Sequence, residues 1–255
     1  MCAALRFSKP PPADSRQPHS RTDPRAYSMS DTVPPEPVSK DTRNLMRVLE
    51  HQGITLVLDV GANIGQYAQR LRRGGYAGRI VSIEPLSAAH AALTAAAAGD
   101  PDWSVESRMA LGDGDTPVTL QVSGESDMSS VLDFTAEMAD LLDGSAYVGT
   151  EVASQARLER IFPRHARPGD RVLLKIDTQG TERRVLDGAR GVLPRIAVVQ
   201  MELSIVPVYD GELSYRDMIQ HMAELGFVPA LFIPGYFNRR TARLIGMDGV
   251  FVRRG

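Results

Sequence analysis

The sequence predicts an α/β fold: a doubly wound, seven-stranded and mostly parallel sheet with an antiparallel C-terminal strand. From residue 41 onward, short apolar runs alternate with segments whose apolar side chains recur at helical spacing. The runs at 56–60 and 196–203 are largely apolar, which is typical of strands buried on both faces. A β-α-β-α-β order implies right-handed crossovers, and therefore a parallel sheet.

The individual elements follow from the same patterns. Strands are predicted at 56–60, 79–84, 103–110, 171–177, 196–203, 227–233 and 249–253, with an extra hairpin strand at 118–122. Helices are predicted over 41–50, around 67–71, over 87–98, around 185–193 and over 215–225, where Gly226 follows the last one. A loop rather than a helix joins the last two strands, so we expect them to run antiparallel.

Composition excludes several classes of protein. The chain has 255 residues and a formal net charge of −2, which argues against a strongly basic nucleic-acid binder. Cys2 is the only cysteine, so the chain forms no internal disulfide and no thiolate zinc cage, as suits the reducing cytoplasm. No stretch is apolar enough to predict a membrane span. The oligomeric state is not predicted by the sequence.

The first forty residues differ from the rest. They hold eight of the 17 prolines, and their composition predicts a disordered tail over 1–40 ahead of a single domain over 41–255. Scattered arginines without a following apolar segment argue against a signal peptide. Met29 shortly precedes the predicted domain and is an alternative start of translation.

Polar residues gather where the predicted strands end, which is where ligands of doubly wound sheets bind. The loop Asp59-Val-Gly-Ala-Asn-Ile-Gly65 has glycines that allow a tight turn and a close backbone approach. Asn63 replaces the middle glycine of a dinucleotide fingerprint, and no P-loop lysine is present. Asp59 suits the sulfonium and amino group of S-adenosylmethionine, and Glu84 is placed to accept hydrogen bonds from ribose hydroxyls. The alternative for the loop is a plain strand-to-helix turn.

Several segments together resemble the FkbM family of S-adenosylmethionine-dependent methyltransferases, from about residue 41 to the end. They are Leu58-Asp-Val-Gly-Ala-Asn-Ile-Gly65, Ser82-Ile-Glu-Pro85, Ala110-Leu-Gly-Asp113, Leu174-Lys-Ile-Asp-Thr-Gln-Gly-Thr-Glu182, Glu202-Leu-Ser-Ile-Val-Pro-Val-Tyr209 and Met247-Asp-Gly-Val-Phe251. Members often have Val-Glu where this chain has Thr178-Gln179, and a bulkier residue in place of Thr181. Asp177 and Glu182 are retained.

The resemblance implies a class I Rossmann-like methyltransferase fold and methyl transfer from S-adenosylmethionine to a hydroxyl of a small molecule or a glycan sugar. The residues expected to bind this cofactor are Asp59, Gly61, Ala62, Asn63, Gly65, Glu84, Pro85, Ala110 and Asp177. An alcohol acceptor benefits from a base that takes its proton as the new bond forms. Asp177 is the first choice for this base, although it is as well suited to bind the methionine amino group or to cap a helix.

Glu202 and Lys175 complete the predicted catalytic group. Glu202 is costly to bury alone, so we expect either a polar site or an ion pair there, and Lys175 is expected to pair with one of the carboxylates. Asp177 and Glu202 also offer oxygen ligands to a divalent metal, which nothing else in the sequence supports.

The acceptor is assigned to Ser129, Ser130, Glu182 and Tyr236, each with a plainer alternative. The serines suit an ordinary loop, Tyr236 suits core packing, and Glu182 suits the first turn of a helix. Two other functions remain open: an NAD(P)-dependent Rossmann oxidoreductase, and a module that binds a nucleoside without catalysis.

Overall fold

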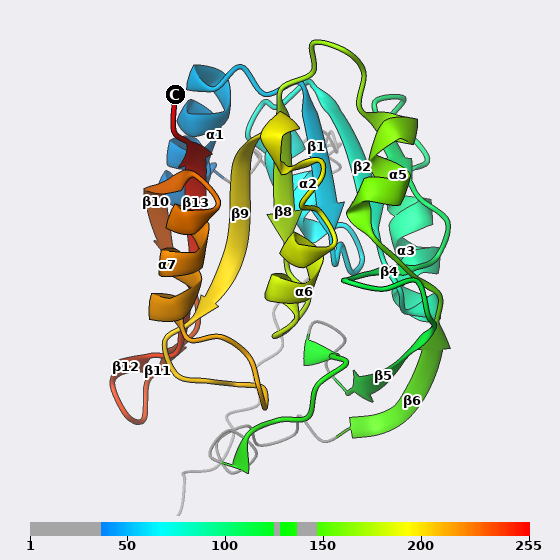
Figure 1. Cartoon of the computed structure of the whole chain (residues 1–255), viewed down its shortest axis with the longest axis vertical. Coiled ribbons are helices and arrows are strands. Elements are labelled where there is room, and N and C mark those ends of the chain that lie inside the picture. The colour runs from blue at the N-terminus through cyan, green and yellow to red at the C-terminus, as the bar shows by residue number, and fades with distance from the viewer. Residues whose placement is uncertain (1–36, 125–127, 137–146) are drawn as a thin grey trace, which may run out of the picture. The chain divides into compact units, whose positions relative to one another are not determined.

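A seven-stranded sheet forms the centre of the computed structural model, which describes residues 37–124, 128–136 and 147–255 (Figure 1). The predicted tail lies outside the described residues as far as position 36. Across the sheet the strands are β10 (Phe227–Pro234), β13 (Gly246–Arg253), β9 (Ile196–Ser204), β8 (Val172–Ile176), β1 (Leu56–Val60), β2 (Arg79–Ile83) and β3 (Trp103–Val105). Neighbours from β9 to β3 are parallel, whereas β13 is antiparallel to both β9 and β10, which confirms the predicted fold class.

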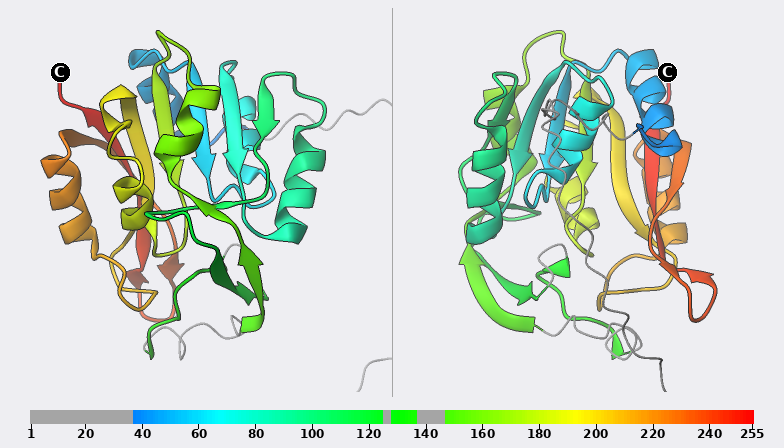
Figure 2. Two further views of the ribbon diagram at one scale, coloured as in Figure 1. Left: turned by 45° about the vertical axis from the view of Figure 1, so that its right-hand side comes forward. Right: turned by 180° about the vertical axis from the view of Figure 1, so that it is seen from behind.

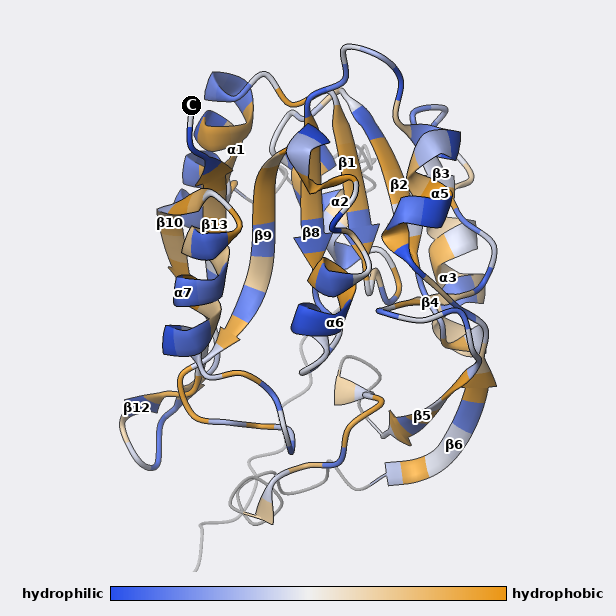
Figure 3. Cartoon of the chain, viewed as in Figure 1, coloured by the Kyte–Doolittle hydropathy of each residue, from blue (hydrophilic) through white to orange (hydrophobic). Residues whose placement is uncertain are grey.

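Helices cover both faces of this sheet, as Figure 2 shows from two further sides. One face packs against α1 (Lys40–His51), α2 (Gln66–Arg73) and α3 (Ser87–Ala97). The other face packs against α5 (Leu158–His165), α6 (Glu182–Asp187) and α7 (Tyr215–Glu224). Apolar residues concentrate in the central strands, which are buried on both faces (Figure 3). Burial of these residues is the main stabilising contribution to the fold.

The order of the strands reverses between β1 and β8. From β1 the chain continues to β2 and β3 on one side, and from β8 to β9 on the other. At such a switch point, the loops after two adjacent parallel strands diverge and leave room for a ligand at their carboxyl ends. The fold therefore directs attention to the residues that follow β1 and β8.

Two predicted elements are shorter than the sequence pattern indicated. The strand predicted at 103–110 ends at Val105. The Glu106 carboxylate just beyond it accepts the backbone N–H of Ser107 at 2.9 Å and lies 2.8 Å from the ring of His165. The helix predicted through Leu193 ends at Asp187, and Leu193 begins a separate 3₁₀ turn, Leu193–Arg195. Gly188 follows the end of α6, and a Cβ atom added there would lie 1.9 Å from the carbonyl oxygen of Gly112.

Smaller pairs of strands extend from the main sheet. The predicted hairpin strand is β5 (Val118–Ser123), which pairs antiparallel with β6 (Tyr147–Ala153). The other pairs are β4 (Ala110–Leu111) with β7 (Gln155–Ala156), and β11 (Phe237–Asn238) with β12 (Arg243–Leu244). In the part of the chain that the structure describes, no helix is long and apolar enough to cross a membrane.

Candidate active site

A cavity of about 400 Å³ lies at the carboxyl ends of the central strands. Its wall comes from the loops after β1, β2 and β8, from β4, and from the facing parts of α2, β9 and β13. Its volume falls within the range of about 300–1,000 Å³ that is typical of small-molecule sites. Nine of the residues assigned to function from sequence line it: Gly61, Ala62, Asn63, Glu84, Pro85, Ala110, Ser129, Lys175 and Asp177.

The loop after β1 passes very close to the end of β8. Gly61 has φ +70°, and a Cβ atom there would lie 1.8 Å from the carbonyl oxygen of Asp177. Gly65 has φ +94° and leads directly into α2, where a Cβ atom would lie 2.8 Å from the ring of Trp103. Only glycine fits either position without displacing its neighbours. Gly61 therefore brings bare backbone to the edge of the cavity, whereas Gly65 lets the start of α2 pack against Trp103.

Glu84 holds this loop to the end of β2. Its two carboxylate oxygens accept the backbone N–H groups of Asn63 and Leu86, each at 2.8 Å. Burial raises the pKa of Glu84, although these hydrogen bonds and the charge of Lys175 oppose the effect. The carboxylate lies on the cavity wall, so its remaining lone pairs are available to hydroxyl donors of a ligand.

Asp59 is placed differently from the sequence prediction. Its side chain is fully buried and does not line the cavity. One carboxylate oxygen lies 3.1 Å from the Lys175 ammonium, and the other accepts the Ser82 hydroxyl at 3.1 Å. Asp59 therefore does not face a ligand in the cavity. Its carboxylate instead pairs with Lys175. Lys175 also donates to the Gly61 carbonyl oxygen at 3.0 Å. The lysine that pairs with Asp59 therefore also holds the loop after β1.

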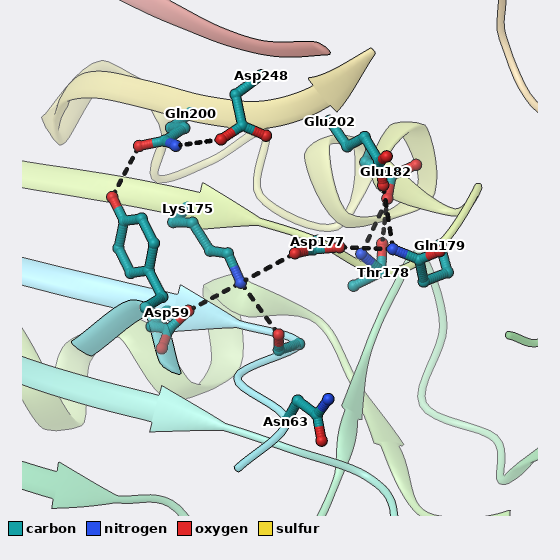
Figure 4. Close-up of polar contacts among 12 residues, drawn as sticks. Asp59, Asn63, Lys175, Asp177, Thr178, Gln179, Glu182, Gln200, Glu202 and Asp248 are labelled. Atoms are coloured by element: carbon teal, nitrogen blue, oxygen red, sulfur yellow. Dashed lines mark hydrogen bonds and ion pairs between the residues drawn. The ribbon is translucent and has the colours of Figure 1, made fainter. Parts of the chain in front are cut away.

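Asp177 extends from the end of β8 into the cavity, with 41% of its side chain exposed. The amide nitrogen of Gln179 donates to Asp177 at 2.7 Å and to Glu202 at 3.0 Å, so one neutral side chain bridges two carboxylates (Figure 4). The Lys175 ammonium approaches the other oxygen of Asp177 at 3.5 Å. Asp177 is thus held from two sides while its carboxylate stays open to the cavity.

Glu182 and Glu202 lie beside each other behind this bridge, and neither lines the cavity (Figure 4). Burial raises the pKa of Glu182 to about 7, and Glu182 accepts the backbone N–H of Thr178 at 2.8 Å. Burial, followed by the charges of Asp177 and Glu182, raises the pKa of Glu202 to about 8. The predicted acceptor role of Glu182 is therefore not matched by its position, which is that of a buried carboxylate in the first turn of α6.

The three other acceptor candidates separate in the structure. Ser129 lines the cavity, and its hydroxyl accepts the backbone N–H of Ser123 at 3.0 Å. Ser130 is buried and donates to the carbonyl oxygen of Gln179 at 2.5 Å, so it anchors the chain rather than lining the cavity. Tyr236 is 55% exposed and does not line this cavity, so its assignment to the acceptor stays a prediction.

The sequence analysis did not predict two networks of polar side chains. In one, the Tyr67 hydroxyl donates to Gln200 at 2.7 Å, and the Gln200 amide donates to Asp248 at 3.0 Å. In the other, the Tyr209 hydroxyl donates to the amide oxygen of Gln179 at 2.6 Å. Polar residues inside the apolar runs of β9 and β13 were the available signal for Gln200 and Asp248. Tyr209 and Gln179 lie inside segments that carry the family resemblance, but their contact depends on the fold.

The cavity fits S-adenosylmethionine, which no part of the structure contains. The backbone at Gly61 and the carboxylates of Glu84 and Asp177 line the cavity, so hydrogen-bond acceptors are available there to the hydroxyl and ammonium groups of such a ligand. Among the described residues, no group of three His, Cys, Asp or Glu side chains is arranged to hold a metal ion.

Comparison with known proteins agrees with these features. The family model for the methyltransferase FkbM domain matches residues 59–229. A search of curated proteins gave no match.

Solved structures with a similar arrangement include a ribosomal protein L11 methylase from Lactobacillus delbrueckii subsp. bulgaricus, at 13% identity and TM-score 0.42, which covers 84% of this chain and 79% of that one. A methyltransferase described as putative from Thermobifida fusca matches at 11% identity and TM-score 0.44, over 85% and 80% of the two chains. The CcbJ methyltransferase from Streptomyces caelestis matches at 9% identity and TM-score 0.43, over 84% and 95%.

The family match spans more than half of the chain and includes the loop after β1, Glu84 and the end of β8. Together with the strand order, it identifies the class I Rossmann-like methyltransferase fold. The chain belongs to the FkbM family and is an S-adenosylmethionine-dependent methyltransferase.

Proposed function

We propose that this methyltransferase transfers its methyl group to a hydroxyl oxygen of a small molecule or of a sugar, within a domain that spans residues 41–255. The observation that carries the proposal is the Asp177 carboxylate, which is exposed in the cavity at the end of the central strand β8. A carboxylate at that position accepts the hydrogen bond of an alcohol and takes its proton as the oxygen is methylated.

The bound donor supplies a methyl group that its sulfonium sulfur already activates. The remaining task of the protein is to align the acceptor oxygen with that carbon and to exclude water. Gln179 and Lys175 restrict the Asp177 carboxylate from two sides, at 2.7 and 3.5 Å. These two contacts hold the carboxylate in place beside the cavity.

The other predicted catalytic residues take supporting roles in this proposal. Glu202 holds the far side of the Gln179 amide, and Lys175 joins Asp59, Asp177 and the loop after β1. Glu84 is assigned to the ribose hydroxyls of the donor, with Pro85 and Ala110 beside it on the same wall.

The test is methyl transfer by purified wild type and Asp177→Asn, with radiolabelled S-adenosylmethionine and an extract of the producing organism. We expect labelled product whose methyl group resists mild alkali, because an ether survives treatment that hydrolyses a methyl ester. Asp177→Asn should lower the rate by about 10²–10⁴-fold, the usual contribution of a general base. Calorimetry with S-adenosylhomocysteine measures any accompanying loss of donor affinity, and a saturating donor concentration in the assay removes its effect on the rate.

The control is Asp115→Asn, which makes the same change at a surface carboxylate paired with Arg160. An alkali-labile or nitrogen-bound methyl group would overturn the hydroxyl assignment. An unchanged rate for Asp177→Asn would show that Asp177 is not the general base.

The same assay separates the two alternative functions. A nucleoside-binding module would bind S-adenosylhomocysteine and label no product. An NAD(P)-dependent oxidoreductase would bind NAD in preference, which calorimetry with both nucleotides measures directly.

A further inference from the structure

Arg70 lies on the wall of the cavity and forms no ion pair with any residue that the structure describes. It lies in α2, and its guanidinium carbon is 5.0 Å from the ring centroid of Tyr67. Its Nε–H is buried and has no hydrogen-bond acceptor among the residues that the structure describes. A buried donor left without an acceptor costs free energy, so a ligand that supplies one gains affinity there.

The other cations on this wall are already engaged or remain in solvent. Lys175 is bound to Asp59, Asp177 and the Gly61 carbonyl oxygen. Arg73 and Arg184 are exposed, so water solvates their charges. Arg70 alone of the four combines partial burial with a buried, unpartnered donor in the described part of the chain.

Carboxylates share the same cavity with Arg70. Asp177 and Asp248 both line it, and the charge of Arg70 opposes the effect of burial, which raises the pKa of Asp248. No direct ion pair joins Arg70 to Asp248 within the described residues, and the amide of Gln200 donates to one oxygen of that carboxylate at 3.0 Å. The wall therefore presents separate sites for a cation and for an anion.

The amino-acid end of S-adenosylmethionine carries one ammonium and one carboxylate. We propose that Arg70 binds this carboxylate, while the ammonium is held by the acidic groups of the cavity. Arginine suits the role because its planar guanidinium binds a carboxylate through two parallel hydrogen bonds. The inference rests on the family assignment and is independent of whether the acceptor is a hydroxyl.

The experiment compares wild type with Arg70→Met, which keeps an unbranched side chain and removes the charge. Calorimetry measures the affinity of each for S-adenosylhomocysteine and for its decarboxylated analogue, which keeps the ammonium and lacks only the carboxylate. We expect Arg70→Met to weaken S-adenosylhomocysteine binding by about 10- to 100-fold, as for other charge-assisted pairs. Binding of the decarboxylated analogue should change by less than about 3-fold.

Arg70→Lys keeps the charge without the planar fork, and its affinity for S-adenosylhomocysteine should lie between those of wild type and Arg70→Met. Gln69→Met, on the exposed side of the same helix, controls for the change to methionine and should leave both affinities unaltered. Urea unfolding of each variant confirms that α2 remains folded.

Two outcomes would overturn the proposal. Equal weakening of both ligands would show that Arg70 acts through the shape of the site rather than through the carboxylate. Unchanged binding of both ligands would show that Arg70 does not bind S-adenosylmethionine. Its guanidinium would then be left to another ligand, such as an anionic group of the methyl acceptor.

Discussion

Gly61 shows how one residue determines the shape of the donor site. Its positive φ turns the chain away from β1, and its missing side chain lets the loop lie against the carbonyl group of Asp177. The backbone of the loop then lies on the wall of the cavity, in direct contact with the end of β8. A substitution here disturbs the donor loop and the end of β8 together.

Gly61→Ala should therefore both destabilise the protein and abolish donor binding. The new methyl group would lie 1.8 Å from a backbone oxygen, which cannot move as a flexible side chain can. Gly75→Ala is the matched control, because Gly75 has φ +93° but no atom within 4 Å of an added Cβ. We expect Gly75→Ala to cost about 1–2 kcal/mol from backbone strain alone, and Gly61→Ala at least about 2 kcal/mol more.

Urea unfolding and calorimetry with S-adenosylhomocysteine measure the two effects. Equal stabilities of the two alanine variants would mean that the loop moves away from β8 without cost. That result would contradict the close packing described for this site.

Single residues also mark how far the sequence could predict the site. Gly61, Glu84 and Asp177 were predictable because strand ends and glycine spacing place them at the switch point. Gln179 was not, since its importance comes from a side chain that reaches Asp177, Glu202 and Tyr209 at once. Such contacts join residues 23 and 30 positions apart along the chain, and no local pattern records them.

At the scale of elements, β1 and β8 are coupled by charge as well as by backbone hydrogen bonds. Asp59 and Lys175 are direct neighbours in the parallel register of the two strands. The register therefore sets the ion pair, and the ion pair favours this register over a shift by one residue. Because both side chains are buried, either partner alone would leave an uncompensated charge in the core.

Lys175→Met should accordingly destabilise the protein by about 3–5 kcal/mol, the usual effect of removing one partner of a buried pair. The double variant Asp59→Asn with Lys175→Met should recover a large part of this loss, because neither position then carries a buried charge without its partner. Urea unfolding measures both, with Arg183→Met as a surface control that should cost at most about 1 kcal/mol. A double variant as unstable as Lys175→Met would show that lost packing, rather than charge, determines the effect.

The elements that the sequence predicted too long share one physical cause. Strand β3 and helix α6 both end beside a contact that is distant in sequence. After β3, the Glu106 carboxylate lies 2.8 Å from the ring of His165, and after α6, Gly188 packs against the backbone of Gly112. Periodicity detects which face of an element is buried, but it does not detect such contacts. The seven strands and the antiparallel ending were predictable because apolar runs and helical spacing extend over many residues.

For the whole molecule, the acidic groups gathered at the switch point make stability depend on pH. Burial raises the pKa values of Glu182 and Glu202 to about 7 and about 8, whereas both groups lose their protons near pH 4.5 in the unfolded chain. Between these values the folded protein binds more protons than the unfolded chain. The free energy of unfolding therefore falls as the pH rises from about 5 to 8.

Glu202→Gln tests this dependence without removing the acceptor of the Gln179 amide, because a glutamine oxygen still accepts that hydrogen bond. The variant should be the more stable protein at pH 8, and its decline in unfolding free energy between pH 6 and 8 should be shallower by about 1 kcal/mol per pH unit. Urea unfolding at several pH values measures the slopes, with Glu50→Gln on the exposed surface of α1 as the control. Parallel slopes for Glu202→Gln and wild type would place the titrating group elsewhere, whereas a change confined to Glu202→Gln would assign the pH dependence to the carboxylate cluster beside the cavity.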